Sequence, residues 1–536
     1  MKSRKFRVFL LFFVFIFTVA TSAQDAPTES LRISLTGDES TINPYTYVTG
    51  YPGWNMLLLQ YDTLYQLDAD GIPQPWLATS AEKSEDGLTV TLELRDDVLW
   101  HDGEKFTAED VVFTVNYFKE FNHGRFTRAL GSIASAEATG EYSVVLTLSA
   151  PAPSLEMGTF ADVPMLPQHI WSEIDAPDAE DAEFSIDVNI GTGPYKLVEY
   201  QPDQFYRFEA NADYFQGAPT VQELTFIQYA DTTGTIAALQ SNEVDMLVGS
   251  VPPEQVDLLR MGGDIEIIQG PLFTTDMIIF DMAQAPFNNA VARKAMSLAI
   301  NRQDIVDTVY LGAGTVGNIG WIHPVSVFRN TAVETVYDVD QAKALLDEAG
   351  ITDSDGNGIR ELDGAPLSFE FLVASDNSLR IRTAELVREM LLEIGIDAQI
   401  VVMERTAQVQ AVWPDFDVSK GRNYQMSMFG WSAPVQADPI RIATLVNSDP
   451  AVGVLNLSGY VNPVADELSL ELLQTIEPVR QKELLDELQA IIAEDLPFIM
   501  LDYPDGMYAY RSAVYSGWVF MSGQGVFHKL SFLRSS

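Results

Sequence analysis

One unit of the sequence fixes the class of fold. "LSFEFLVA" (367–374) and "IDAQIVVM" (396–403) have the composition of strands, and "SLRIRTAELVREMLLEIG" (378–395) between them is amphipathic at helical spacing. Gly395 supplies a stop signal for that helix. A strand, a helix and a strand in this order predict a right-handed crossover between parallel strands.

The same alternation of strand and helix patterns continues along the chain, which predicts an α/β fold. "LRISLT" (31–36) is an expected early strand, and residues 87–100 alternate at the period of a strand. A helix is expected to begin after Thr107, with Asp110 completing a capping box. A second helix is expected over residues 342–349. The full length of 536 residues predicts two or three domains rather than one core.

The charge balance excludes one class of partner. The chain has 76 Asp and Glu against 32 Lys and Arg, a net charge of −44. Nucleic-acid binding needs clustered positive charge, so no nucleic-acid partner is expected. The chain has no cysteine, which excludes disulfides, thiolate metal sites and a cysteine nucleophile.

The first 23 residues have the pattern of a secretory signal peptide. Four basic residues in "MKSRKFR" precede the thirteen residues "VFLLFFVFIFTVA", and small residues follow at Thr21 and Ala23. The apolar run is too short for a membrane-spanning helix, which requires ~20 residues. An uncleaved anchor is the alternative. With no cysteine for a lipid anchor, the expected location of the mature chain is the periplasm.

Six segments in succession resemble the bacterial extracellular solute-binding proteins of family 5, the receptors of ABC importers for peptides, nickel and oligosaccharides. The segments are "LWHDGEKFTAEDVVFTVNYF", "GTGPYKLVEY", "NADYFQGAP", "PFNNAVARKAMSLAINRQDIV", "AKALLDEAG" and "NLSGYVNPVADEL". The resemblance implies a two-lobed α/β binding protein with a ligand cleft between the lobes and a subdomain inserted in lobe I. It implies lobe I at 24–285, with the insertion at about 77–190, lobe II at 286–505, and a return to lobe I at 506–536.

An acidic loop in the second half is a candidate calcium site. "TDSDGNGIRELDG" (352–364) offers oxygen ligands at the spacing of a calcium-binding loop, although Gly364 stands where the bidentate Glu would be expected. The candidate ligands are Asp353, Asp355, Asn357, the carbonyl of Ile359, and Glu361. A structural Ca²⁺ and a plain polar loop both remain open. No other cofactor is expected.

No motif indicates catalysis, and the chain is not expected to be an enzyme. The histidines have no metal-ligand spacing, which weakens a nickel ligand; they are His101, His123, His169, His323 and His528. A secreted glycoside hydrolase is the less favoured alternative, because abundant carboxylates and aromatics would also suit that chemistry.

Two tryptophans are the expected ligand contacts. Trp54 follows "YPG" in a loop that the resemblance brings to the cleft from lobe I, and Trp431 lies in "FGWSAPVQADP" (429–439) of lobe II. Asn456 and Tyr460, in "NLSGY", belong to the next segment that the resemblance places at the cleft.

The segment 429–439 also bears on the ligand class. Peptide-binding members carry an Asp a few residues after "GW", and that Asp pairs with the peptide ammonium. Here Pro434 stands at that place, and Asp438 fits a later Asp-Pro of the pattern. A site without the ammonium partner favours a neutral ligand, so an oligosaccharide is expected. Because Asp438 could replace the missing acid after an insertion, an oligopeptide is the alternative.

The expected function is that of a monomeric periplasmic receptor. It would capture its ligand by closure of a hinge between the lobes and deliver it to the membrane permease of an ABC importer.

Overall fold

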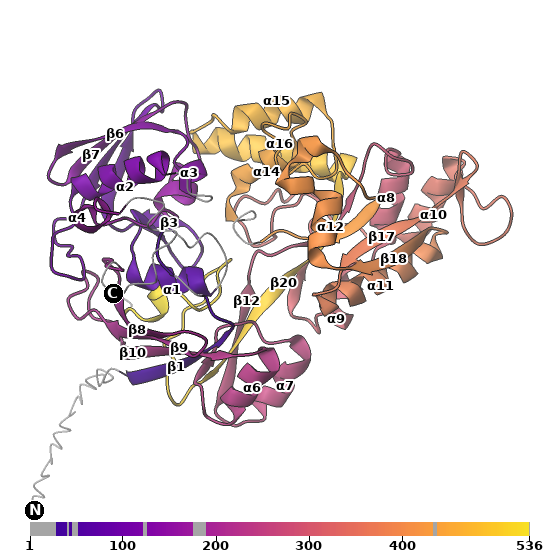
Figure 1. Ribbon diagram of the computed structural model, residues 1–536. Coiled ribbons are helices and arrows are strands. Elements are labelled where there is room, and N and C mark those ends of the chain that lie inside the picture. Colours follow the sequence, from indigo (N-terminus) through magenta and orange to yellow (C-terminus); the bar gives the residue numbers. More distant parts are fainter. Residues whose placement is uncertain are drawn as a thin grey trace, which may run out of the picture.

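Two lobes share one sheet in the computed structural model of the chain (Figure 1). The structure describes residues 28–39, 42–45, 52–121, 126–174, 189–432 and 437–534. The predicted signal peptide, residues 1–23, lies outside them. Among the described helices, none is both long enough and apolar enough to span a membrane.

The shared sheet has twelve strands, ten of them in the order β18-β17-β19-β13-β20-β11-β1-β10-β9-β8, while β12 and β14 also pair with β20. Lobe I contributes β1 (Thr28–Thr36), β8 (Tyr195–Gln201), β9 (Phe205–Ala210), β10 (Val221–Tyr229), β11 (Met246–Leu247) and β12 (Ile265–Pro271). Lobe II contributes β13 (Asp276–Phe280), β14 (Gly314–Val316), β17 (Ser368–Ala374), β18 (Asp397–Met403) and β19 (Met426–Phe429). The long strand β20 (Phe498–Arg511) belongs to both lobes.

The chain passes between the lobes along β20 and along the segment between β12 and β13. β12 pairs with residues 505–511 of β20, and β13 pairs with residues 498–502. The expected second boundary, at residue 505, falls at this crossing. The expected first boundary, at residue 285, comes after β13, yet β13 already pairs with β19 and contributes to the core of lobe II. The first crossing therefore lies at 271–276.

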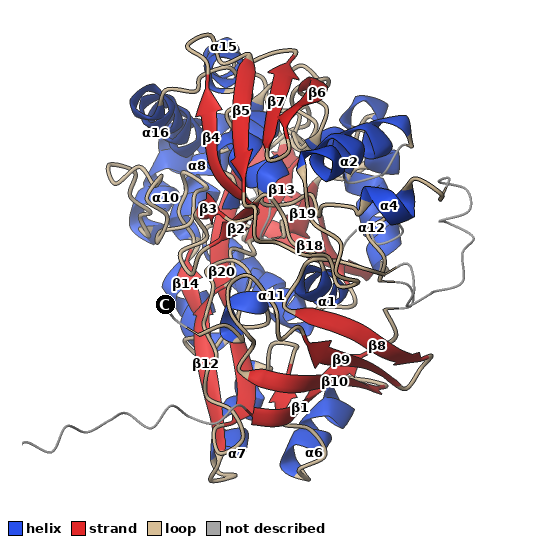
Figure 2. Cartoon of the chain, turned by 90° about the vertical axis from the view of Figure 1, so that its left-hand side faces the viewer, coloured by secondary structure: helices blue, strands red, loops and turns tan. Residues whose placement is uncertain are grey.

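A separate four-stranded sheet forms the inserted subdomain, within residues 77–190 (Figure 2). Its order is β4-β5-β7-β6, with β4 (Ala78–Lys83), β5 (Thr89–Leu94), β6 (Ile133–Gly140) and β7 (Ser143–Leu148). Helix α2 (Ala108–Glu120) lies against β6 and begins with the predicted capping box of Thr107 and Asp110. The short helices α3 (Phe126–Ala129) and α4 (Gln168–Trp171) contact α2.

The predicted crossover in lobe II is confirmed. β17 and β18 are parallel, from the pair Ser368 and Asp397 to the pair Ala374 and Met403, and α11 (Ser378–Glu393) connects them. The apolar residues of lobe II form two large clusters that both include residues of β13 and β17. The other helices of lobe II are α8 (Ala290–Ala299), α9 (Arg302–Thr308), α10 (Val339–Glu348), α12 (Arg405–Val412), α14 (Ile442–Val446), α15 (Pro463–Leu472) and α16 (Pro478–Asp495).

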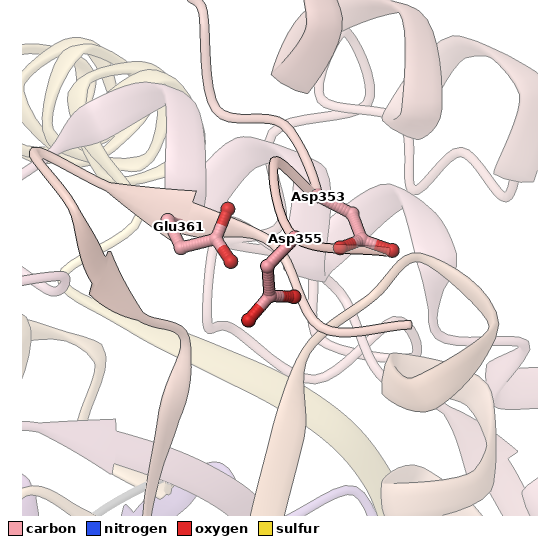
Figure 3. Close-up of side chains that lie close together, drawn as sticks. All are labelled: Asp353, Asp355 and Glu361. Carbon is pink, nitrogen blue, oxygen red and sulfur yellow. The ribbon is translucent and has the colours of Figure 1, made fainter. Parts of the chain in front are cut away.

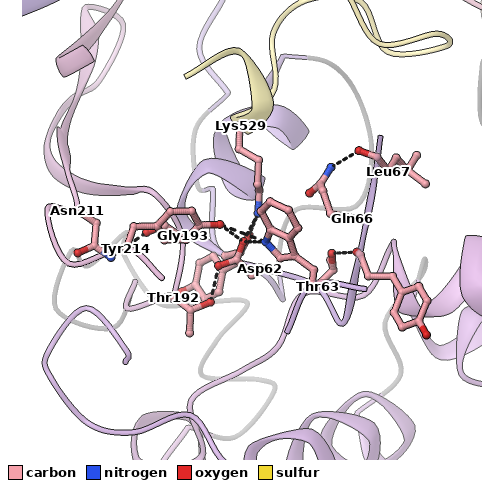
Figure 4. Close-up of polar contacts among 12 residues, drawn as sticks. Asp62, Thr63, Gln66, Leu67, Thr192, Gly193, Asn211, Tyr214 and Lys529 are labelled. Atoms are coloured by element: carbon pink, nitrogen blue, oxygen red, sulfur yellow. Dashed lines mark hydrogen bonds and ion pairs between the residues drawn. The ribbon is translucent and has the colours of Figure 1, made fainter. Parts of the chain in front are cut away.

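A buried ion pair ties the end of the chain to lobe I (Figure 4). Asp62 follows α1 (Gly53–Gln60), and its carboxylate forms a salt bridge with Lys529. Both side chains are nearly inaccessible, 0% and 1% exposed. Tyr214 donates to Asp62 Oδ1 at 2.9 Å, and Thr192 donates to Oδ2 at 2.9 Å. Both carboxylate oxygens therefore have donors, which is the condition for burying a charge.

Candidate ligand site between the lobes

The wall of lobe II that faces the junction is built from strand ends. β17 is parallel to both β18 and β19, so the carboxyl ends of these three strands lie at one edge of the sheet. β19 ends at Phe429, which pairs with Met277 immediately after the crossing. In open α/β sheets, ligands bind outside the carboxyl ends of the strands. The described residues 430–432 and 437–438, the start of α11 and the start of α12 therefore form the candidate wall.

Described residues of lobe I approach this half of the molecule at several places. Ser154, from the inserted subdomain, lies close enough to the carboxyl of Asp438 to lower its pKa. Arg382 of α11 lies 3.6 Å from Glu254 of lobe I. Gly87, in the turn between β4 and β5, lies so close to Ile476 that a Cβ atom there would be 3.0 Å from Ile476 Cδ1. The two lobes are therefore in contact.

Gly430 has a steric role at the junction. A Cβ atom at this position would lie 2.0 Å from the carbonyl oxygen of Thr275 and 2.2 Å from Nη2 of Arg380. Both distances are far below van der Waals contact. The glycine thus allows the Arg380 guanidinium to reach the crossing segment, where its Nε donates to Asp276 at 2.6 Å.

A second acid lies beside this ion pair. Asp502 of β20 is the direct sheet partner of Asp276, and its side chain is completely buried. No hydrogen-bond partner among the described residues reaches either of its carboxylate oxygens. Burial raises the pKa of Asp502 well above its usual value, and the negative charge of Asp276 raises it further.

Trp54 lies in the core of lobe I rather than on a cleft surface. It is 3% exposed, belongs to α1, and its ring lies 5.8 Å from that of Phe126. The expected exposed loop is a helix here, and that helix contacts β8 of lobe I. A contact between Trp54 and a ligand stays a prediction, but its packing makes it chiefly a core residue.

Trp431 is also largely covered by protein. It is 8% exposed, and its ring lies 5.8 Å from Trp413 and 5.4 Å from Phe429. Its backbone N–H donates to the hydroxyl of Thr275 at 2.8 Å. Its indole N–H is buried and has no hydrogen-bond partner among the residues that the structure describes. The expectation of an indole face presented to a ligand is therefore not supported by the packing of this ring. Pro434 lies outside the described residues.

Asn456 and Tyr460 stabilise their own loop. The Asn456 amide donates to the carbonyls of Asn447 and Tyr460, and its oxygen accepts from the Tyr460 N–H at 2.9 Å. The Tyr460 hydroxyl donates to Asp495 at the end of α16. These bonds use the polar atoms that were expected to face a ligand, and both side chains are buried. These bonds give both residues a structural role, and ligand contacts by this pair stay a prediction.

Asp438 stays a predicted ligand contact. Its carboxyl caps the short 3-10 helix η6 (Pro439–Arg441) through the Ile440 N–H and lies near Ser154 of the other lobe. Burial raises the pKa of Asp438, against the opposing effects of Arg441, Ser154 and the Ile440 N–H. Arg441 is exposed, so no buried cation balances this carboxyl within the described residues.

The acidic loop follows α10 on the side of lobe II away from lobe I (Figure 1), and Figure 3 shows the three acidic side chains close together. Carboxylate oxygens of Asp353, Asp355 and Glu361 lie within 4.8 Å of one another, close enough to hold one cation. Asp353 also accepts hydrogen bonds from the N–H groups of Gly356 and Gly358. These bonds lower the pKa of Asp353, with that from Gly358 the largest cause. Calcium binding, with Asn357 and Ile359 as further ligands, stays a prediction.

The sequence reasoning missed Asp502, Arg380 and the contacts of Ser154 and Arg382. Two features of the sequence could have indicated these residues. Arg380 and Arg382 stand in the first turns of α11, where positive charge is unfavourable to the helix dipole, so each requires a nearby acid. Asp502 directly follows the apolar run "FIML" in β20, and a buried acid beside such a run is unusual.

Known proteins share the whole architecture. The chain is 28% identical to the oligopeptide-binding protein AppA of Bacillus subtilis over 439 residues, 80% of this chain and 78% of that protein. The structure of that protein in complex with a nonapeptide has a TM-score of 0.73 at 25% identity and covers 95% of this chain and 100% of that one.

Two further solute-binding proteins are similar to the chain over most of its length. The glutathione-binding protein GsiB of Escherichia coli K12 is 27% identical over 447 residues, 82% of each chain. The ABC transporter substrate-binding protein CtaP of Listeria monocytogenes has a TM-score of 0.79 at 26% identity, covering 94% of this chain and 99% of that one. The family model "Bacterial extracellular solute-binding proteins, family 5 Middle" matches residues 73–451. With this match over most of its length, the chain belongs to family 5 of the bacterial extracellular solute-binding proteins.

Proposed function

We propose that this chain is the oligopeptide receptor of an ABC importer and that Asp438 binds the ammonium group of the peptide. The ligand class rests first on the relatives, since AppA is an oligopeptide-binding protein and GsiB binds glutathione, itself a peptide. The oligosaccharide that the missing acid at Pro434 favoured has no counterpart among these relatives. The expected alternative, an oligopeptide, is therefore preferred.

The observation that carries the proposal is the position of Asp438. It is a buried carboxyl on lobe II, close enough to Ser154 of lobe I for that hydroxyl to lower its pKa, and the described residues give it no buried cation. A buried carboxylate is stable only when a cation or several donors compensate it. A peptide ammonium held between the lobes would supply that compensation and would favour closure, because it would contact both lobes.

The other parts of the proposal follow from the family. Its members are extracellular binding proteins rather than enzymes. We propose a periplasmic location after removal of residues 1–23, a monomeric state, and delivery of the peptide to a membrane permease. Mass spectrometry of ligand that copurifies with the exported protein tests the ligand class directly. A recovered peptide supports the proposal, and a recovered oligosaccharide contradicts it.

Calorimetric titration of Asp438→Asn tests the residue. The amide keeps the hydrogen bond at the start of η6 but removes the charge. Affinity for an unblocked nonapeptide should fall ~30-fold or more, as for loss of one partner of a buried charge pair. The N-acetylated nonapeptide should bind wild type weakly, and the substitution should hardly change that value. Asp415→Asn, at an exposed acid of the same lobe, is the matched control.

The pH dependence gives a second readout. Because burial raises the pKa of Asp438 above its usual value of 3.8, the free carboxyl becomes ionised only as the pH rises through that raised pKa. The ammonium binds the ionised form, so wild-type affinity should increase over that window and then level off. Asp438→Asn should lack this rise. Equal pH profiles for the two proteins would remove Asp438 from the site while leaving the peptide ligand open.

A further inference from the structure

The strongest unexplained feature outside the proposed ligand contacts is the carboxyl pair at the junction of the lobes. Asp276 on β13 and Asp502 on β20 are direct partners in the sheet, at the point where the chain crosses between the lobes. They are 3% and 0% exposed. Two acids therefore face one another across the two strands that connect the lobes.

The described side-chain donors around the pair all donate to Asp276. Arg380 Nε donates to Asp276 Oδ1 at 2.6 Å, and the Tyr310 hydroxyl, which follows α9, donates to Asp276 Oδ2. The hydroxyl has a single proton, so it cannot also donate to Asp502, although it lies near both carboxyl groups. Neither oxygen of Asp502 has a partner among the described residues.

Among the residues that the structure describes, the neighbouring elements provide no cation for Asp502 besides Arg380. β14 pairs with it through Val316 and contributes no charged side chain. The groups that act on Asp502 are Asp276 from β13, Tyr310 and Arg380. Arg302, near the next residue of β20, uses its guanidinium on the carbonyls of Met500 and Ser297. One guanidinium thus faces two carboxyl groups, and full ionisation would leave one buried negative charge uncompensated.

We propose that the Asp276–Asp502 pair holds one proton when the lobes are closed, and that loss of this proton loosens the junction between the lobes. The proton neutralises Asp502, and its O–H can donate to the Tyr310 oxygen or to Asp276. Two ionised carboxylates at this place would repel one another across the paired strands. Water must then enter to solvate them, and parting of the lobes at the crossing admits it.

The effect on stability has a defined sign. In the unfolded chain, the Asp502 carboxyl has its usual pKa of 3.8, whereas burial raises this pKa in the folded protein. The folded state therefore binds the proton more tightly, and its stability falls as the pH rises from about 4 to the raised pKa. Above the raised pKa, the loss is complete and constant. The distance between the lobes should change only near the raised pKa, where the folded protein itself releases the proton.

The first experiment compares thermal unfolding of wild type and Asp502→Asn without ligand, from about pH 5 to about pH 9. Asn cannot ionise, and its amide can donate to Asp276 as the protonated acid would. The melting temperature of wild type should fall relative to that of Asp502→Asn by ~1 °C per pH unit until the raised pKa is reached. Asp281→Asn is the control, since the Asp281 carboxylate accepts the N–H of Ala283 and the amide of Gln284.

The second experiment measures the distance between the lobes. The chain has no cysteine, so cysteines introduced at the exposed positions Asp257 of lobe I and Glu494 of lobe II can carry spin labels selectively. The mean distance should increase at alkaline pH in the otherwise wild-type chain and stay constant when Asp502→Asn is added. Should Asp502→Asn fail to fold, Asp502→Ser is used, because it also cannot ionise. The proposal would be overturned if the melting temperature and the distance between the lobes changed with pH in the same way in wild type and in Asp502→Asn. This outcome does not depend on which ligand the protein binds.

Discussion

Asp62 in lobe I and Asp502 at the junction are both inaccessible carboxyl groups, but their surroundings differ. Asp62 has a lysine beside it and donors on both oxygens. Asp502 shares its site with a second acid, and the nearby arginine and tyrosine bond to that acid instead. A buried acid can be accommodated as a paired anion or as a neutral group. A paired anion such as Asp62 is compatible with a rigid core. A neutral acid such as Asp502 at the hinge can lose its proton as the pH rises.

The largest loss of stability is expected from removing the cation of the Asp62–Lys529 ion pair. Lys529→Met should destabilise the protein by ~3–5 kcal/mol, because it leaves the charge of Asp62 buried without a cation. Denaturant unfolding measures the loss. Lys343→Met is the control, since Lys343 and Glu393 form an exposed pair that contributes little. A small loss of unfolding free energy for Lys529→Met would indicate that Asp62 is neutral in the folded protein, as proposed for Asp502.

A smaller effect is expected from a change at the hinge that touches neither acid. Gly430→Ala should destabilise by about 1–3 kcal/mol, the size of an overpacking substitution, because its Cβ would collide with Thr275 and Arg380. Displacing Arg380 from Asp276 would also remove the cation from the hinge. Denaturant unfolding tests this, with Gly140→Ala as the control, because a Cβ at Gly140 would meet only Ser143 at 3.7 Å. Equal stabilities of the two variants would contradict the steric role of Gly430.

The smallest effect is expected at the exposed acids of the loop at 352–364, where water already solvates the carboxylates. If Ca²⁺ occupies this loop, millimolar calcium should raise the melting temperature by ~1–3 °C, and a chelator should reverse it. Asp355→Asn should abolish the shift, and peptide affinity should stay unchanged because the loop is remote from the junction. Melting curves that do not respond to calcium would leave the loop as a plain polar connection.

The sequence by itself determined the elements and the family. The α/β class, the crossover from β17 to β18 and the capping box at Thr107 are local, since they depend on periodicity and on residues three or four apart. The six ordered segments gave the two-lobed fold, because they preserve a pattern that extends over the whole chain. The choice of peptide over oligosaccharide came instead from the relatives.

Only the tertiary structure decided what each candidate side chain contacts. Trp54, Asn456 and Tyr460 were expected at the ligand because of their segments. The structure shows what else they contact: Trp54 packs against Phe126, Asn456 bonds within its loop, and the Tyr460 hydroxyl donates to Asp495 of α16. Asp502 became notable only when β20 placed it beside Asp276, 226 positions earlier in the chain. Burial and pairing depend on residues far apart in sequence, and a local pattern contains no information about such partners.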